Sequence, residues 1–405
     1  MRDSWNELTI GDEINFLGGF PFSSSKFNEE GVGVPLIRIR DLLKSSQETY
    51  FSGLYSNTYL INEGDVLIGM DGDFHIVKWK NSPSLLNQRI LKVSGKKSGE
   101  IDIDFLFYYL KPFLLDVHNK TAATTVKHLS TFDVSREVDL FPPLPQQQKI
   151  AKILSTVDNV IEQTESTIAK YQAIKQGLMH DLFTRGIDVN TGKLRPTPHE
   201  APDLYKESAL GFLPRDWEVE ELGNVGDVKM CKRIFSYQTK NEGDIPFYKI
   251  GTFGRKPDAF ISKELYKEFK NKYSFPSMGS ILISASGTIG RLVVYKGEEA
   301  YFQDSNIVWI ENNFNLISNE YLKYIFPFVK FKTEGGTIQR LYNNILKSGV
   351  FPCPSNSLEQ ELIVKKLSVI DNKIQTEQQA LAKYQQLKAG LLQDLLTGKV
   401  EVSED

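Results

Sequence analysis

Two stretches of the chain share one pattern of apolar positions, in which the spacing alternates between four and three residues. The first runs from Ile150 to Leu182 and the second from Ile363 to Leu395, so equivalent residues lie 213 positions apart. This heptad spacing predicts a long helix with an apolar seam along one face. We therefore expect two similar helices, at 145–184 and 355–397, with about 38 residues of each, or roughly 57 Å, in the repeated run.

Because the two seams match position for position, they favour pairing of the helices with each other, in an antiparallel arrangement. The residues expected to form the contact are the apolar seam positions Leu154, Val157, Ile161, Ile168, Tyr171 and Leu178 in the first helix and Leu367, Ile370, Ile374, Leu381, Tyr384 and Leu391 in the second.

Each seam is interrupted at the same two places. The interrupting residues are Thr164 and Lys175 in the first copy and Glu377 and Lys388 in the second. Polar residues in a seam cost stability but can fix the register of a helix pair. At the lysine positions, we expect the preceding residue, Ile174 or Leu387, to supply the apolar contact.

The segments before each helix also resemble each other, more weakly. Short apolar runs separated by glycine turns, such as 65–70, 280–284 and 291–295, predict strands. The stretches 104–118 and 318–331 predict helices. The fold class is therefore α+β: two mixed α/β globular domains, each followed by a long helix, with pseudo-twofold symmetry. The expected segments are a first domain at 1–144, a helix at 145–184, a surface linker at 185–215, a second domain at 216–354, a helix at 355–397 and a tail at 398–405.

Composition is ordinary for a soluble globular protein, with 40% hydrophobic and 24% charged residues in a chain of 405. No apolar run approaches the length that spans a bilayer, and the first residues lack the apolar core of a signal peptide. The two cysteines have no CxxC partner, and the five histidines show no paired metal spacing, so no metal site is expected. We expect a cytoplasmic protein.

The net charge of −3 excludes a globally basic nucleic-acid binder but allows a local basic surface. The stretch 228–240 carries Lys229, Lys232 and Arg233 and no acidic residue. Arg38 and Arg40 alternate within an apolar run, and they would share one face if that run is a strand. A solvated charged face is the alternative interpretation of each cluster.

Two loops and two short polar runs add candidate chemistry. The loops at 69–75 and 284–291 are rich in glycine and in small polar side chains, which suits either a tight turn or contact with phosphates and base edges. The runs at 86–89 and 302–306 contain asparagine, glutamine and arginine, the side chains that read adenine or guanine edges.

The machinery of a DNA-modifying enzyme is missing. The Pro-Pro at 142–143 lacks the flanking residues of an amino-methyltransferase loop, and no GxxxxGK[ST] loop is present. One loose nuclease-like pattern, a PD…ExK signature, joins Asp258 with Glu268 and Lys270. The last two residues lie in a polar run that predicts a helix and not a strand, which disfavours a nuclease.

The order and duplication of several segments resemble the specificity (S) subunits of type I restriction–modification enzymes. These segments are 18–27, 142–150, 178–186, 245–251 and 277–284, and with the repeated helices they cover essentially the whole chain. The second half departs from the pattern at 351–356, where a Phe-Pro-Cys-Pro sequence replaces the Pro-Pro-Leu entry to the helix.

The resemblance implies that each globular half is a target recognition domain reading one part of a bipartite, asymmetric sequence in double-stranded DNA. The paired helices would set the spacing and scaffold two adenine-N6 methyltransferase (M) subunits, which bind S-adenosylmethionine. Restriction (R) subunits, which use ATP and Mg, would join through them. The chain itself would hold no cofactor and no catalytic residue.

The candidate DNA contacts combine the loops, the polar runs and the basic clusters with the segments that carry the resemblance. They are Ser24, Ser25, Lys26, Arg38, Arg40, Asp71, Asn87, Gln88, Lys127 and His128 in the first half, and Lys229, Lys232, Arg233, Lys249, Ser284, Ser286, Thr288, Gln303, Asp304, Ser305, Gln339 and Arg340 in the second. Two alternatives stay open: a coiled-coil adaptor without sequence-specific DNA binding, and a stand-alone DNA-modifying enzyme, which the missing motifs disfavour.

Overall fold

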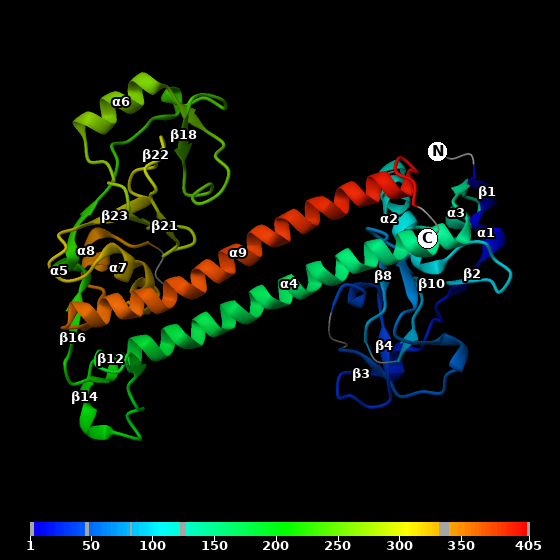
Figure 1. Ribbon diagram of the computed structural model, residues 1–405, viewed down its shortest axis with the longest axis horizontal. Helices are drawn as coiled ribbons and strands as arrows, with labels where there is room; N and C mark the ends of the chain where they lie inside the picture. The colour runs from blue at the N-terminus through cyan, green and yellow to red at the C-terminus, as the bar shows by residue number, and fades with distance from the viewer. Residues whose placement is uncertain (1–3, 45–47, 82, 122–126, 332–339, 403–405) are drawn as a thin grey trace. The chain divides into compact units, whose positions relative to one another are not determined.

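The computed structural model describes residues 4–44, 48–81, 83–121, 127–331 and 340–402 and divides into two compact units (Figure 1). Unit 1 consists of 1–166 and 378–405, and unit 2 of 167–377. The two long helices, α4 (Leu144–Thr184) and α9 (Ser357–Leu396), each contribute residues to both units. Each unit therefore contains one globular part together with a portion of both helices.

Unit 1 is built on a four-stranded antiparallel sheet of order β2-β10-β7-β8, against which the helix α2 (Ile103–Lys120) packs. The sheet strands are β2 (Ile14–Gly18), β10 (Ile90–Gly95), β7 (Val66–Gly69) and β8 (Ile76–Lys78). A second sheet, of order β3-β5-β4-β9-β6, has strands β3 (Phe27–Asn28), β5 (Tyr50–Phe51), β4 (Val34–Ile37), β9 (Ser84–Leu86) and β6 (Leu60–Ile61). The remaining elements are β1 (Asn6–Thr9), which pairs with β11 (Val138–Phe141), the helices α1 (Ile10–Glu13) and α3 (Thr131–Ser135), and the 3-10 turns η1 (Ser24–Lys26), η2 (Ile39–Asp41) and η3 (Asn57–Tyr59).

Unit 2 repeats this plan with a sheet of order β17-β23-β20-β21. Its strands are β17 (Gly226–Lys229), β23 (Ile307–Asn312), β20 (Ile281–Ser284) and β21 (Leu292–Val294). A second sheet contains β19 (Phe260–Ile261), β18 (Ile245–Tyr248) and β22 (Tyr301–Phe302), and β16 (Trp217–Glu221) pairs with β24 (Val350–Pro354). The helices are α5 (Leu222–Val225), α6 (Lys263–Lys272), α7 (Asn319–Ile325) and α8 (Asn343–Lys347), and the 3-10 turns are η5 (Ser236–Gln238) and η6 (Phe326–Phe328). The expected fold class, with its internal repeat, is confirmed.

The helix expected at 318–331 is shorter than predicted. It ends at Ile325 and gives way to the turn η6, which contains Pro327. A proline inside a helix removes a hydrogen bond and clashes with the preceding turn, so the α-helix stops before it.

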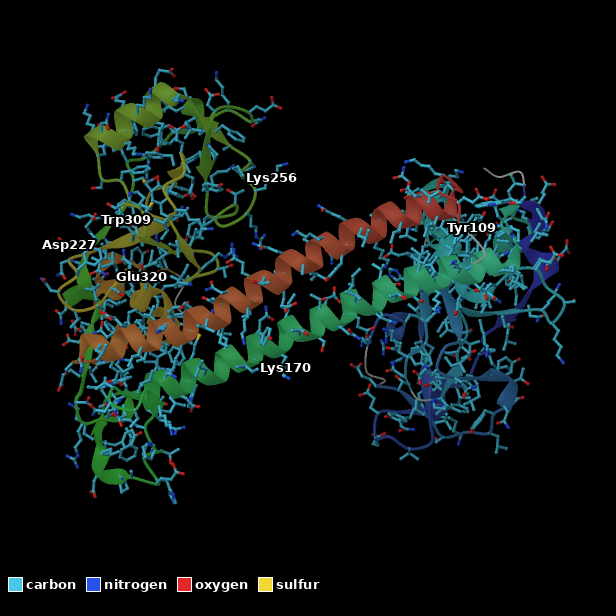
Figure 2. All side chains as sticks on the ribbon, in the orientation of Figure 1. Tyr109, Lys170, Asp227, Lys256, Trp309 and Glu320 are labelled. Carbon is cyan, nitrogen blue, oxygen red and sulfur yellow. The ribbon has the colours of Figure 1, made fainter. Side chains whose placement is uncertain are left out.

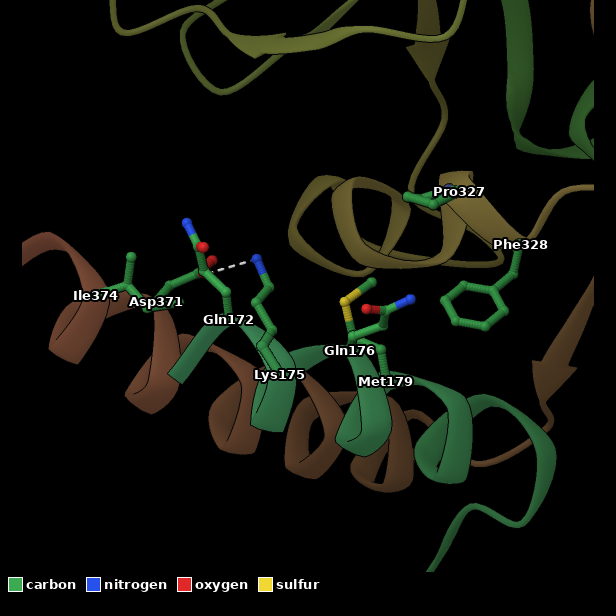
Figure 3. A pocket seen from close by; sticks show the side chains of 8 residues that line it. All are labelled: Gln172, Lys175, Gln176, Met179, Pro327, Phe328, Asp371 and Ile374. Atoms are coloured by element: carbon green, nitrogen blue, oxygen red, sulfur yellow. Dashed lines mark ion pairs between the residues drawn. The ribbon is translucent and has the colours of Figure 1, made fainter. Parts of the chain in front are cut away.

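The long helices pair antiparallel within each unit. In unit 1, Asp158 near the start of α4 forms an ion pair with Lys388 near the end of α9, at 2.5 Å. In unit 2, Lys175 near the end of α4 pairs with Asp371 near the start of α9, at 2.6 Å (Figure 3). Each aspartate also accepts a hydrogen bond from a tyrosine of its own unit, Tyr108 at 2.9 Å or Tyr324 at 2.7 Å.

These ion pairs correct one expectation about the seam. Ile174 and Leu387 do not fill the lysine positions, because their side chains are 43% and 52% exposed. The lysines themselves occupy the seam and reach the aspartate of the other helix. The sequence pattern did not reveal the partner because each aspartate lies one residue beyond an apolar seam position, outside the heptad pattern.

The twelve expected seam residues are all buried or partly buried. Leu154 lies in the core of unit 1 with Leu395, and Leu367 lies in the core of unit 2 with Leu182. Burial of a leucine side chain stabilises a fold by roughly 1.5–3 kcal/mol. The two ends of the helix pair are therefore part of the two globular cores.

The segment 185–215 is folded, although its prolines and polar residues predicted a linker across the surface. It forms two hairpins, β12 (Ile187–Asp188) with β13 (Lys193–Leu194) and β14 (Tyr205–Ser208) with β15 (Gly211–Pro214), joined by the turn η4 (Pro202–Leu204). Ile187, Tyr205 and Leu213 are buried. The apolar residues are too widely spaced to form a recognisable pattern, yet the hairpins bury Tyr205 and bring Ile187 and Leu213 into the core of unit 2.

One buried carboxylate holds this segment in place. Glu359 of α9 is fully buried and accepts hydrogen bonds from the backbone N–H of Ile187 at 2.7 Å and from the indole of Trp217 at 3.1 Å. It also accepts two bonds from the guanidinium of Arg195, at 2.5 and 2.9 Å. Gly186 adopts a φ of 68°, and an added Cβ there would meet Arg195 and Glu359 at 2.3 Å. We call Glu359, Arg195, Trp217 and the Ile187 N–H the Glu359 network.

Asp371 should make the stability of unit 2 depend on pH. Burial alone would raise the pKa of this carboxyl, but hydrogen bonds from Lys175, Lys323 and Tyr324 outweigh burial and lower the pKa below its ordinary value. A lowered folded-state pKa contributes stability that is present above the unfolded value, about 3.9, and is lost as the pH falls through the folded value.

Asp371→Asn is therefore expected to lower the free energy of unfolding by about 1.5–3 kcal/mol at pH 7. When the pH falls below 4, the variant should lose less further stability than the wild type. Urea unfolding between pH 3 and pH 7 measures both effects. Glu361→Gln, at an exposed position of the same helix, is the control. A variant with an unchanged acid dependence would contradict this role.

Candidate nucleic-acid interface

In unit 1, the structure brings together polar side chains from three separate segments. Asp71 follows β7, Arg89 precedes β10, and His128 comes from the chain after α2. The Asp71 carboxylate lies 2.7 Å from Nδ1 of His128 and 3.6 Å from Nε of Arg89, and Nη1 of Arg89 lies 3.4 Å from the same His128 nitrogen. The side chains of Arg89 and His128 are 56% and 46% exposed. We call Asp71, Arg89 and His128 the unit 1 cluster.

In unit 2, a second set of polar side chains lines a surface hollow. Arg233 forms an ion pair with Asp304 at 2.9 Å, and Arg340 donates to the carbonyl of Ser305 at 2.9 Å. Ser286 and Asn306 join their side-chain oxygens at 2.8 Å, with the serine hydroxyl as donor. Each unit thus gathers residues that are distant in sequence at one place: the candidates Asp71 and His128 with Arg89 in unit 1, and the candidates Arg233, Ser286, Asp304, Ser305 and Arg340 with Asn306 in unit 2.

The two places have the same backbone framework. In unit 1, Met70 donates to the carbonyl of Arg89 at 2.9 Å and accepts from the N–H of Leu129 at 2.7 Å. In unit 2, Ala285 donates to the carbonyl of Asn306 and accepts from the N–H of Leu341, both at 2.8 Å. The positions of Asp71, Arg89 and His128 in unit 1 therefore correspond to those of Ser286, Asn306 and Arg340 in unit 2.

Two turn residues in these places have an unusual backbone conformation. Arg89 has a φ of 71° and Ser305 a φ of 60°. The left-handed region is unfavourable for residues other than glycine. Such residues persist where the surrounding structure holds them, and they cluster at binding sites.

Nine further candidates fall into three groups. Those exposed and outside the clusters are Ser24, Ser25 and Lys26 in η1 and Thr288 in the β20–β21 turn. Those beside the clusters are Gln88, which is exposed, and Lys127, which is partly buried. Those engaged elsewhere in unit 2 are Lys249, in an ion pair with Asp258 at 2.9 Å; Lys232, whose ammonium lies 5.2 Å from the ring centroid of Tyr273; and Lys229, opposite Trp309 in the sheet. Trp309, on β23, is labelled in Figure 2.

Three candidates serve the fold. Ser284 is buried, accepts from the N–H of Arg291 and donates to the carbonyl of Thr288, which closes the β20–β21 turn. Asn87 is buried. Gln303 accepts from the N–H of Ile250. For Ser284 the tight-turn interpretation of the loop is therefore the right one. Gln339 lies outside the described residues.

Arg38 and Arg40 do not share the face of a strand. Strand β4 ends at Ile37, and Arg38 caps the 3-10 turn η2. The buried carboxylate of Asp41 accepts from the Arg38 backbone N–H and lies 3.6 and 3.9 Å from the Nε atoms of Arg38 and Arg40. Arg38 also donates to the hydroxyl of Thr49. Because Asp41 closes the turn, it breaks the alternation that the apolar run predicted.

Arg89 and Asn306 were not among the candidates, although both lie within the polar runs. A signal for them exists in the sequence, since each directly precedes an apolar strand that begins with isoleucine, at 90 and at 307. Aligning the two copies on those isoleucines would have selected both residues.

No cluster of three or more potential metal ligands occurs among the residues that the structure describes. Burial raises the pKa of the Cys231 and Cys353 thiols to about 12, so neither is a reactive thiolate. Glu268 and Lys270 of the nuclease-like pattern lie on helix α6, as their polar run predicted. Within the described part of the chain, no helix is both long and apolar enough to cross a membrane.

The duplication is matched by a known family. The model of the type I restriction modification DNA specificity domain matches the chain twice, at residues 2–173 and 214–386. The chain belongs to this family. It carries two DNA specificity domains, and the resemblance seen in the sequence is confirmed.

Individual specificity subunits show the same relationship. The chain is 38% identical over 326 residues to a protein named "putative type I restriction enzyme specificity subunit" in Haemophilus influenzae, with 77% of each chain covered. It is 30% identical over 315 residues to the EcoBI specificity subunit of Escherichia coli, covering 73% of this chain and 63% of the relative. The crystal structure of the type I restriction–modification S subunit from M. genitalium shares the fold, with a TM-score of 0.65 and 16% identity over 98% of this chain and 97% of that one.

Proposed function

We propose that this chain recognises a bipartite, asymmetric sequence in double-stranded DNA, with one half-site read by each unit. The observation that carries the proposal is the pair of equivalent polar places, which share their backbone hydrogen bonds but differ in their side chains. Base edges are distinguished by the donors and acceptors that a protein presents. Two binding sites that share backbone hydrogen bonds but carry different side chains are suited to recognising two different half-sites.

The chain acts only in DNA recognition. We propose that it does so in the cytoplasm. Two methyltransferase subunits, which use S-adenosylmethionine to methylate adenine at N6, assemble on the chain, and restriction subunits that use ATP and Mg join through them. The family membership supports these partners, and the match of two domains supports two methyltransferase subunits. The specificity subunit itself holds no cofactor and performs no catalytic step.

The proposal is tested by selection from a library of duplexes with randomised sequence. The full chain, in complex with its methyltransferase subunits, is expected to enrich a motif of two specified parts separated by an unspecified spacer. Specific binding is expected to be at least 1,000-fold tighter than binding to unselected duplexes at physiological salt. Binding without any sequence preference would overturn the proposal and favour a coiled-coil adaptor.

A further inference from the structure

The two equivalent places differ in the kind of hydrogen-bonding group that each presents. At the position after β7 or β20, unit 1 has the carboxylate of Asp71 and unit 2 has the hydroxyl of Ser286. At the position before β10 or β23, unit 1 has the guanidinium of Arg89 and unit 2 has the carboxamide of Asn306. The two places share two backbone hydrogen bonds, although the residue with positive φ is Arg89 itself in unit 1 and Ser305, one position before Asn306, in unit 2.

The guanidinium of Arg89 is held on one side and open on the other. Its Nε faces the Asp71 carboxylate at 3.6 Å and its Nη1 faces His128 at 3.4 Å. A guanidinium carries five N–H donors in a rigid fork, so donors on both terminal nitrogens can still point outward. The side chain is 56% exposed, which leaves this outer edge accessible to a ligand.

Among the base edges of the major groove, the acceptor pair that fits two parallel N–H donors is O6 and N7 of guanine. The chemistry of a carboxamide fits adenine, whose N6 amino group donates and whose N7 accepts. Asn306 has its Oδ1 fixed by the hydroxyl of Ser286, which orients the amide. A carbonyl oxygen has two lone pairs, so the same atom can also accept from a base.

We propose that Arg89 reads a guanine in the half-site of unit 1, and that Asn306, at the equivalent position of unit 2, reads an adenine in the other half-site. Asp71 is a positioning residue that orients the Arg89 guanidinium, and His128, whose Nδ1–H donates to the Asp71 carboxylate, holds Asp71 in place. This inference rests on the proposed function, because it names the bases recognised by a DNA reader. It assigns one base pair in each half-site to one side chain.

The test uses the duplex selection above with the full chain and its methyltransferase subunits. The wild type first defines the motif. Arg89→Ala is expected to lose about 10- to 100-fold of the discrimination at a single G·C pair in one half-site. Asn306→Ala is expected to reduce the discrimination at a single A·T pair in the other half-site by a similar factor. All other positions of the motif should stay as they are.

Three further variants distinguish a loss of base recognition from a loss of positive charge and from a folding defect. Arg89→Lys keeps the charge but lacks the fork, so it should retain the salt dependence of binding and lose the same discrimination. Asp71→Asn should weaken discrimination at the same G·C pair, whereas a defect in folding would weaken binding to every sequence equally. Arg136→Ala removes another exposed arginine of unit 1, one that pairs with Asp133, and should leave the motif unchanged.

The outcomes distinguish this inference from the function on which it rests. If the wild type selects a bipartite motif and Arg89→Ala selects the same motif with the same discrimination, the assignment of Arg89 is wrong and the proposed function stands. If Arg89→Ala alters several pairs, or pairs in both half-sites, the assignment of one base pair to one residue is wrong. If the wild type selects no motif, both proposals fall.

Discussion

Glu359→Ala is expected to destabilise unit 2 by about 3–5 kcal/mol, the range for removing one partner of a buried ion pair. The carboxylate is fully buried and satisfies three donors at once: Arg195, the Trp217 indole and the Ile187 N–H. Its loss would leave a guanidinium that is 13% exposed with only one charge partner, the exposed carboxylate of Asp216 at 3.0 Å. A folded domain has only about 5–15 kcal/mol of stability, so this change removes a large part of it.

Urea or thermal unfolding of the full chain measures the effect. Glu361→Ala, two residues further along the same helix and exposed, is the matched control and should change stability by less than about 0.5 kcal/mol. Glu359→Gln keeps the shape and hydrogen-bonding capacity of the side chain and should fall between the two. Equal stability of the Glu359 and Glu361 alanine variants would show that the network contributes nothing.

Exchange of residues 226–349 for the corresponding segment of a relative with another target should replace one half-site of the motif and leave the other intact. The segment contains the unit 2 sheet and the polar residues around Asn306, while β16, β24 and the Glu359 network stay with the host chain. Each mismatched base pair costs about 1–3 kcal/mol, so a half-site of several pairs is expected to change preference by 1,000-fold or more.

Duplex selection with the hybrid chain gives the new motif directly. The reciprocal exchange of residues 10–137, between β1 and β11 of unit 1, is the control and should replace the opposite half-site. A hybrid in which both half-sites change would contradict independent reading by the two units. The exchanged segment begins directly after α5 and ends two residues after α8, so β16, β24 and both long helices remain those of the host chain.

The long helices could be predicted closely, because a heptad pattern is local and periodic. The expected boundaries 145–184 and 355–397 lie next to those of α4 and α9. The polar contacts of the seam could not be predicted. The pairing of Lys175 with Asp371 depends on how two helices far apart in sequence face each other. A composition rich in proline and polar residues likewise concealed the hairpins of 185–215, whose fold depends on the carboxylate of Glu359.

For the candidate site, residue types indicated the right segments but not which side chains act together. The runs 86–89 and 302–306 lie at equivalent places, yet Asn87 is buried and Arg89 is exposed within the same turn. A positive φ changes the direction in which the side chain of a turn residue points. When such a residue is not a glycine, no local sequence pattern predicts it. The convergence of His128 on Asp71 also requires the tertiary fold.

The division of α4 and α9 between the units has a consequence for synthesis on the ribosome. Unit 2 is one continuous segment, 167–377, whereas unit 1 needs residues after 377. Leu395 and Val402 lie in the same core as Ile150 and Leu154. Domains generally fold in the order of their emergence, N-terminal first. Here part of the core of unit 1 is translated after the whole of unit 2, so we expect the core of unit 2 to be complete before that of unit 1.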